Sequence, residues 1–402
     1  MSPPNDNAID PPSILEHGLN RHFPALLEFE STRELHASEL WWEIRVEAER
    51  VLNAVVGENF AETGSNPRSE TVRALAWNIE RGNIYDGIVE ALKNHERLKD
   101  KDLLLLTELD YGMARSGNRF VAQGIARELK LNYAFAPVYV ALQKGSGVES
   151  EVEGENTLSI HGLAMLSRYP MSNVHAVPLP NGKDKMWGKE KRLGSLRALF
   201  ADIEHPAGKF RAVTVHLDAH CSRAHRQMQI KIVLDHLDTL PPLPVVIGGD
   251  WNTTTFNSQS STRAILGYWR RVLMGPKNVA KNHLPNPERY FERNLFSMLE
   301  KRGYDYRSLN EIGAGTLHYH IESIEKNTNL RDWVPEWCFP FIFWAAGRVG
   351  GQVSGRLDWF TGKGIEIAPG AEPQTIGHLV DDAGTPLSDH DAIGVEFRIS
   401  RT

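Results

Sequence analysis

LRALFADIEHPAGKFRAVTVHL, residues 196–217, contains two apolar runs with no helical pattern between them. Such runs predict two consecutive β-strands. Downstream, a predicted helix over Ser222 to Leu237 precedes another apolar run, PVVIGGD at 244–250. Strands joined both directly and through helices are typical of an α/β or α+β fold. The consecutive strands argue against a simple doubly wound parallel sheet.

The same mixture extends in both directions from this stretch. Upstream, from Thr71 onward, short apolar runs alternate with helical patterns. Helices are predicted over YDGIVEAL (85–92) and from about Asn118, and further strands over VRALAW (72–77), DLLLLTE (102–108), LAMLS (163–167), RLDWF (356–360) and AIGVEFRI (392–399).

The N-terminal part differs from this pattern. Residues 1–30 are polar and proline-rich at their start and predict a flexible arm with a few apolar anchors. Ser31 and Glu34 have the spacing of a capping box, and apolar residues then recur at helical intervals. We therefore expect one long amphipathic helix from Ser31 to near Gly57, within a helical extension and linker over 31–70, followed by a main domain over 71–402.

A long insertion, residues 253–355, interrupts the predicted strands of this domain. It contains one clear helical segment, TRAILGYWRRVLM (262–274), and an aromatic cluster between 333 and 344. The cluster has three interpretations: a small core of the insertion itself, a peripheral contact with lipid, or a wall for an apolar substrate group. Its members are Trp333, Trp337, Phe339, Phe341, Phe343 and Trp344.

Composition sets broad limits on the class of protein. Hydrophobic residues make up 41% of the 402, which is ordinary for a globular protein with a sizeable core. The net charge of −6 disfavours a sequence-independent nucleic-acid binder. The two cysteines indicate reduced thiols, and the chain shows neither a signal peptide nor an apolar run long enough to span a bilayer. We expect a cytoplasmic protein.

Polar residues with catalytic chemistry stand at or near the ends of six predicted strands. Side chains at strand ends converge where a sheet edge meets solvent, which is a common place for an active site. One such residue would be a turn former, but six elements with this property predict a site. The residues are Asn78, Glu108, His216, Asp250 with Asn252, Asp358, and Asp389 with His390.

These residue types suit the cleavage of a phosphoester. A hard cation must neutralise the phosphoryl oxygens, and carboxylate and amide oxygens are ligands for Mg²⁺. The reaction also needs an activated water and donors to the non-bridging oxygens, roles that histidine, aspartate and asparagine fill. Asp358 would hold His390 in the required tautomer.

Seven motifs follow one another along the chain: WNIERG, LLLLTELD, GLAMLSRYP, VTVHL, IGGDWN, RLDWF and LSDHD. In this order they resemble the motif series of the endonuclease/exonuclease/phosphatase superfamily, which includes pancreatic-type deoxyribonuclease, neutral sphingomyelinase and inositol-polyphosphate 5-phosphatase members. The resemblance covers about residues 71–400 without most of the insertion. It implies a four-layered sandwich of two packed mixed sheets flanked by helices.

The resemblance also implies roles for individual residues. Glu108 would be the main Mg²⁺ ligand, with Asn78 and Asp389 beside it and Mn²⁺ as an alternative ion. Asp250 would orient or deprotonate water, and either it or His390 would be the base. Asn252 and His216 would contact the phosphate, and Asp358 would pair with His390.

Two further sets of residues have competing interpretations. Arg115 and Asn118 precede a predicted helix and are candidates to bind a second substrate phosphate or head group, or else form a capped loop. His216, His220 and His225 lie close enough in sequence to suggest zinc. However, Ser222 is the expected cap of the following helix, and their spacing matches no zinc signature.

The sequence therefore predicts a Mg²⁺-dependent phosphoesterase that hydrolyses a mono- or diester by in-line water attack. Its substrate is a soluble phosphometabolite, a phospholipid or sphingolipid head group, or nucleic acid, and the last choice would make it a nuclease. A catalytically silent binding protein on the same fold is the alternative from another class. Against it stands the presence of every expected site residue.

Overall fold

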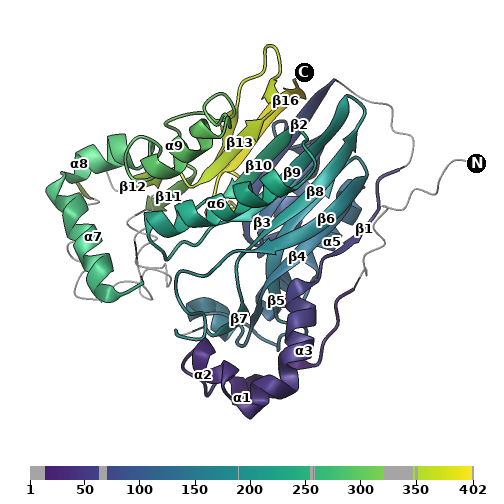
Figure 1. Ribbon diagram of the computed structural model, residues 1–402, viewed down its shortest axis with the longest axis vertical. Coiled ribbons are helices and arrows are strands. Elements are labelled where there is room, and N and C mark those ends of the chain that lie inside the picture. The colour runs from purple at the N-terminus through teal and green to yellow at the C-terminus, as the bar shows by residue number, and fades with distance from the viewer. Residues whose placement is uncertain are drawn as a thin grey trace, which may run out of the picture.

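The computed structural model describes residues 14–62, 70–188, 190–253, 257, 259–320, 347–348 and 352–400. In these ranges two β-sheets pack face to face, with helices on their outer faces (Figure 1). The larger sheet has nine described strands, with a main order of β1-β4-β5-β3-β2-β16-β14. The smaller has five described strands in the order β13-β10-β9-β8-β6. The expected four-layered mixed α/β sandwich is confirmed.

Strands of the larger sheet are β1 (Val56–Glu58), β2 (Thr71–Arg81), β3 (Leu103–Tyr111), β4 (Asn132–Ala141), β5 (Ile160–Ser167), β7 (Arg192–Gly194), β14 (Ile365–Ile367), β15 (Gln374–Ile376) and β16 (Ala392–Ile399). Those of the smaller sheet are β6 (Met171–Pro178), β8 (Arg197–His205), β9 (Gly208–His216), β10 (Val245–Asp250) and β13 (Asp358–Lys363). A separate pair consists of β11 (Leu317–His320) and β12 (Gln352–Gly355).

The helices are α1 (Phe23–Leu26), α2 (Thr32–His36), α3 (Glu39–Asn53), α4 (Tyr85–Asn94), α5 (Val121–Leu129), α6 (Arg223–Thr239), α7 (Ser261–Leu273), α8 (Pro276–Asn278) and α9 (Arg293–Lys301). Shorter turns are η1 (Leu19–His22), η2 (Ala114–Ser116) and η3 (Gly147–Glu151), and η4 (Val279–His283) is a π-helix.

Strand β3 shows how the layers are specified by sequence. Its side chains alternate between the two faces of the sheet. Leu103 and Leu105 pack between the sheets, whereas Leu104 and Leu106 pack with the helical layer that includes α4 and α5. Both faces are buried, which explains why the strand is a continuous run of leucines rather than an alternation with polar residues.

Part of the insertion belongs to the outer layer of the smaller sheet. Helix α9 packs beside α6, and its residues Leu295, Phe296 and Leu299 are buried in the same core cluster as the two sheets. The buried guanidinium of Arg226 on α6 pairs with Glu292, just before α9. In Figure 1, α7 and α8 extend away from the sheets beside β11 and β12. The aromatic cluster over 333–344 lies outside the described residues.

The N-terminal region differs from the expectation in two respects. The single helix predicted from Ser31 to near Gly57 is two helices, because Ser38 caps a second one by accepting a hydrogen bond from the Trp41 amide at 3.2 Å. Residues 14–30, expected within a flexible arm, contribute Leu15, Leu19 and Leu26 to the core. The extension is thus packed onto the larger sheet from Ile14 onward.

Across the described residues, none of the helices combines the length and apolar character needed to cross a membrane.

Candidate active site

Three adjacent strands of the smaller sheet place His216, Asp250 and Asp358 in one row. His216 ends β9 and is the register partner of Asp250, which ends β10. Asp250 is in turn the register partner of Asp358, the first residue of β13. Register partners project to the same face of a sheet. The three side chains therefore share one face at one edge of the smaller sheet.

A glycine lets two of these strands approach closely. Gly249 has a φ of 134°, and a Cβ atom there would lie 2.1 Å from the carbonyl oxygen of Val215. No other residue fits this contact without moving a backbone. Gly249 thus serves the close approach of β10 to β9.

The larger sheet supplies Asn78 from β2 and Glu108 from β3, which are parallel neighbours. Each strand has a register irregularity next to its functional residue, between Asn78 and Arg81 and between Leu106 and Leu109. Glu108 has a φ of 56°, a strained value for a non-glycine residue. By simple alternation Glu108 would project with Leu106 toward the helices, so the bulge turns it toward the smaller sheet instead.

The two sheets meet at Asn78, whose amide nitrogen donates to Glu108 Oε1 and to Asp250 Oδ2, each at 3.1 Å. Its amide oxygen accepts from the backbone N–H of Glu80 at 3.1 Å. The amide nitrogen, rather than the oxygen, faces the carboxylates. In this arrangement Asn78 holds the two carboxylates together, and its expected role as a metal ligand stays a prediction.

Glu108, His216 and Asp250 form a donor set suited to a divalent cation. One ligand atom from each lies within 4.8 Å of the others. Burial by itself raises the pKa of a carboxyl group, but Arg81, His216 and His161 hold the pKa of Glu108 well below its usual range. Glu108 is therefore ionised at neutral pH, as a cation ligand must be. The two carboxylates fit a hard ion such as Mg²⁺ or Mn²⁺.

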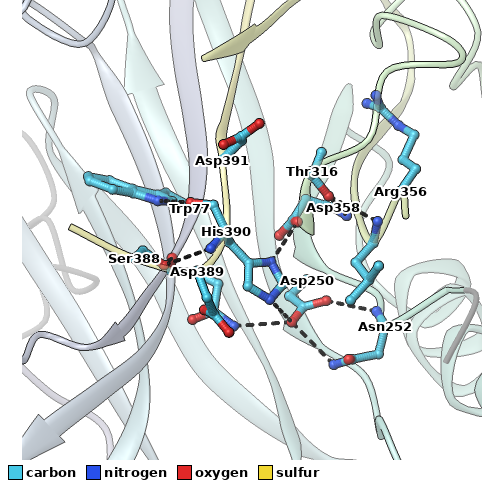
Figure 2. Close-up of polar contacts among 12 residues, drawn as sticks. Trp77, Asp250, Asn252, Thr316, Arg356, Asp358, Ser388, Asp389, His390 and Asp391 are labelled. Carbon is cyan, nitrogen blue, oxygen red and sulfur yellow. Dashed lines mark hydrogen bonds and ion pairs between the residues drawn. The ribbon is translucent and has the colours of Figure 1, made fainter. Parts of the chain in front are cut away.

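His390 lies between two carboxylates, as Figure 2 shows. Its Nδ1 is 2.8 Å from Asp358 Oδ2, and its Nε2 is 3.8 Å from Asp250 Oδ2. The carboxylate of Asp358 accepts a hydrogen bond from Nδ1–H, and Nε2 therefore faces Asp250. Burial opposes a charged imidazole, but Asp358 and Asp250 more than offset it and raise the pKa of His390 well above its usual value.

The loop after β10 fixes Asp250 from the other side. Asp250 Oδ1 accepts from the backbone N–H of Asn252 at 2.8 Å. The side-chain nitrogen of Asn252 donates to Asp250 Oδ2 at 3.2 Å and to the Leu217 carbonyl at 2.9 Å. Asn252 was expected to donate to the phosphate. Its hydrogen bonds in the structure orient Asp250, and a contact with phosphate stays a prediction.

Asp389 lies beside this cluster without joining it. Its side chain is exposed, and its backbone N–H donates to Glu80 Oε2 at 3.1 Å. Two groups of potential metal ligands occur within the described residues, Glu108 with His216 and Asp250, and Asp250 with Asp358 and His390, and neither includes Asp389. Burial and the nearby Asp389 raise the pKa of Glu80 to about 7. The two acids share the rim of the site, and a ligand role for Asp389 stays a prediction.

The two predicted substrate-binding residues have different surroundings. Arg115 is buried and pairs with Asp110 through Nε at 2.7 Å and Nη2 at 3.0 Å, and it also lines a cavity next to the site. Asn118 does not line that cavity, and its side chain bonds to the backbone at Glu155 and Thr157. The contacts of Asn118 therefore favour the capped-loop interpretation.

The cavity adjoining Glu108 and His216 has a volume of about 290 Å³. Most of its basic lining was not predicted from the sequence: Lys183 and Lys185 lie in a loop, and Arg81 and Arg192, although at strand ends, were not among the predicted site residues. The signal was the basic stretch KDKMWGKEKR at 183–192. The basic residues that line the cavity are Arg81, Arg115, Lys183, Lys185 and Arg192.

The three histidines considered for zinc do not form a ligand group within the described residues. Ser222 caps α6 as expected, accepting from the His225 amide at 3.2 Å. His225 Nε2 lies 2.9 Å from the Pro180 carbonyl, while His216 faces Asp250. The structure gives no support to a zinc site there.

Comparisons with known proteins give one sequence match and several similar structures. The pattern of the Endonuclease/Exonuclease/phosphatase family matches residues 75–390. An endonuclease/exonuclease/phosphatase structure from Beutenbergia cavernae is 16% identical, with a TM-score of 0.47, covering 82% of this chain and 72% of its own. TDP2 of D. rerio, complexed with a single-strand DNA product, is 16% identical, with coverages of 82% and 100% and a TM-score of 0.43. The human Nocturnin catalytic domain, with bound sulfate, is 14% identical, with coverages of 87% and 98% and a TM-score of 0.42. None of the curated proteins matches.

Proposed function

Because the chain belongs to the Endonuclease/Exonuclease/phosphatase family, a group of metal-dependent phosphoesterases and nucleases, we propose that it hydrolyses a phosphate mono- or diester by in-line attack of water. The observation that carries the proposal is the meeting of Glu108, His216 and Asp250 within 4.8 Å, next to the His390–Asp358 pair. Ligands for a cation and a proton-exchanging imidazole in one place are the requirements of this reaction.

Glu108 and Asp250 are the residues that would hold the divalent cation, with Mg²⁺ as the proposed ion. When bound, such a cation neutralises the phosphoryl oxygens and so lowers the barrier to attack by water. Asn78 keeps the two carboxylates at a fixed separation through its paired hydrogen bonds. Positioning of this kind is set before substrate arrives, and it therefore costs no reorganisation during the reaction.

The proton is handled by two groups of this chain. The Nδ1 atom of His390 is hydrogen-bonded to Asp358. Nε2 is therefore the atom that exchanges a proton with the water or the leaving oxygen. Asp250 lies 3.8 Å from that nitrogen and accepts hydrogen bonds from Asn78 and Asn252. Its orientation is thus fixed on three sides, which suits a carboxylate that aligns the attacking water.

His216 is the remaining donor. Its Nε2 lies 3.5 Å from Asp250 Oδ2 and 3.9 Å from Glu108 Oε1, beside the proposed cation ligands. A phosphoryl oxygen at the cation would lie within reach of this nitrogen. We assign His216 to the non-bridging oxygens, where a donor stabilises the charge that develops in the transition state.

The test uses the full chain with Mg²⁺ or Mn²⁺ on chromogenic phosphodiesters and monoesters, plasmid DNA and sphingomyelin vesicles. We expect hydrolysis of at least one class and its loss in Glu108→Ala and in His390→Ala. Glu128→Ala, which removes a carboxylate from the surface of α5, is the matched control and should keep activity. A wild-type chain inert on the whole panel, or a Glu108→Ala variant with full activity, would overturn the proposal.

A further inference from the structure

The cavity that adjoins the candidate active site contains more basic groups than the hydrolysis of one phosphate requires. It is lined by Glu108 and His216 of the site and also by Lys183, Lys185 and Arg192. The same space therefore connects the scissile position with a cluster of cations. At about 290 Å³, it has the size of a pocket for a small molecule or a part of one.

The carboxylates that line the cavity already have partners. Asp218 accepts from the backbone N–H groups of Gly182 at 2.6 Å and His220 at 2.8 Å. Asp184 accepts from the backbone and hydroxyl groups of Thr32, and Glu190 pairs with Arg192. Asp218 and Asp184 are thus committed to hydrogen bonds of the fold, and Glu190 to ion pairs with arginines of the cavity wall.

Lys185 is in the opposite situation. Its side chain is 16% exposed, and its nearest acidic partner among the described residues, Asp218, is 3.8 Å away, beyond hydrogen-bond distance. Burial lowers the pKa of its ammonium group although the charge of Asp218 opposes this effect. An anion in the cavity would supply both the charge and the acceptors.

Arg81 also has donors to spare. Its side chain is largely buried, and the residue follows the register shift in β2. Among the described residues, its one ion pair joins Nη1 to Glu149 at 2.9 Å. A guanidinium carries five N–H donors and binds phosphate oxygens in pairs. Arg81 lines the cavity together with Glu108, and an anion held between Arg81 and Lys185 would therefore adjoin the scissile phosphate.

The loop that carries Lys185 is fixed in place. The Arg192 amide donates to the Lys185 carbonyl at 3.0 Å. Lys191 Nζ donates to the carbonyls of Leu27 at 2.6 Å and Phe29 at 2.9 Å, and Asp184 is bonded to Thr32. The N-terminal extension thus holds this loop against the catalytic domain, and the ammonium group of Lys185 is positioned before any ligand binds.

We propose that this cavity binds a second anionic group of the substrate, a phosphate by its chemistry, and that the enzyme prefers small phosphoesters that carry another phosphate. This inference rests on the proposed function of the adjoining site. Three observations carry it. Arg81 and Lys185 have hydrogen-bond donors that the fold does not use, the carboxylates of the cavity wall are paired within the fold, and the cavity is continuous with Glu108 and His216.

The test compares two chromogenic esters, the p-nitrophenyl ester of thymidine 5′-phosphate and the same ester with a 3′-phosphate. Affinities are measured calorimetrically with Mg²⁺ on the full-length His390→Ala protein, in which turnover is suppressed, and KM is measured on the wild type. We expect the second phosphate to strengthen binding and lower KM about tenfold or more. Hydrolysis of the singly phosphorylated ester tests the proposed function separately from this ratio.

Variants locate the effect. Lys185→Met should reduce the ratio of the two affinities to about one, Lys185→Arg should restore most of it, and Lys231→Met on the surface of α6 should leave it unchanged. Equal binding of both esters by the wild type, or a ratio unaffected by Lys185→Met in a folded protein, would overturn the inference even if both esters are hydrolysed. Competition with decathymidylate shows whether the second phosphate comes from a neighbouring nucleotide. In that case decathymidylate displaces the bisphosphate ester at a lower concentration than thymidine 3′,5′-bisphosphate does.

Discussion

The candidate active site and the adjoining cavity are neighbours, but the chain builds them differently. His216, Asp250 and Asp358 occupy register positions on three paired strands, and β-ladder hydrogen bonds fix their spacing. Lys185 and Arg81 lie in a loop and at a bulge, and ion pairs and contacts with the N-terminal extension position them. The spacing of these three reacting groups is thus set by backbone hydrogen bonds, whereas the recognition groups depend on side-chain contacts that can change without disturbing the sheet.

The largest effect is expected where the two sheets meet. Glu108→Gln keeps the size of the side chain but removes the charge that holds the cation, so the rate should fall by about 10³-fold or more. Hydrolysis of the singly phosphorylated ester at saturating Mg²⁺ is the measurement. Glu128→Gln on α5 is the control. A loss of less than tenfold would show that Glu108 is not the principal ligand.

A comparably large effect on stability is expected in the cavity wall. Arg115→Met leaves the fully buried Asp110 without its bidentate partner, which should lower the free energy of unfolding by about 3–5 kcal/mol. Urea denaturation measures this change. The double variant Arg115→Met/Asp110→Asn should regain part of the loss, because no unpaired buried charge remains. If Arg115→Met is as stable as the wild type, Arg115 is free to act on substrate rather than on the fold.

Much of the strand-borne site was accessible from sequence because its residues follow periodic apolar runs. The motif order placed Asp250, Asp358 and His390 at strand ends, and the structure brings them together. The side to which Glu108 points was not accessible, since it depends on a bulge and a positive φ rather than on alternation. The donor orientation of Asn78 likewise depends on a hydrogen bond from the Glu80 backbone.

Most of the cavity lining could not be predicted from the sequence, for a physical reason. Loop residues have no period, so nothing in KDKMWGKEKR indicates that Lys185 faces the space beside Glu108. The break between α2 and α3 is a similar case, because a serine within a helical pattern gives only a weak signal until its side chain is seen to cap.

A smaller effect on rate is expected from the partner of the catalytic imidazole. Asp358→Asn removes the carboxylate that fixes the Nδ1 proton of His390, and the rate should fall about 10²-fold. Because Asp358 raises the pKa of His390, its neutralisation lowers that pKa. The limb of the pH–rate profile that reports His390 should then move to lower pH. A profile unchanged in Asp358→Asn would assign that limb to another group.

The smallest effect tests whether the cavity depends on the N-terminal extension. Thr32→Val removes the hydroxyl that donates to Asp184 at 2.5 Å, a half-exposed contact whose loss should cost about 1 kcal/mol of unfolding free energy. The loop over 184–192 would then be less firmly held, and the preference for the doubly phosphorylated ester should decrease about twofold to threefold, since Lys185 must be ordered when the ligand binds. Hydrolysis of the singly phosphorylated ester should change less, because the β-ladder rather than this loop positions Asp250. Equal losses on both esters would mean that the extension supports the whole sandwich, and the distinction between a strand-borne site and a loop-borne cavity would not hold.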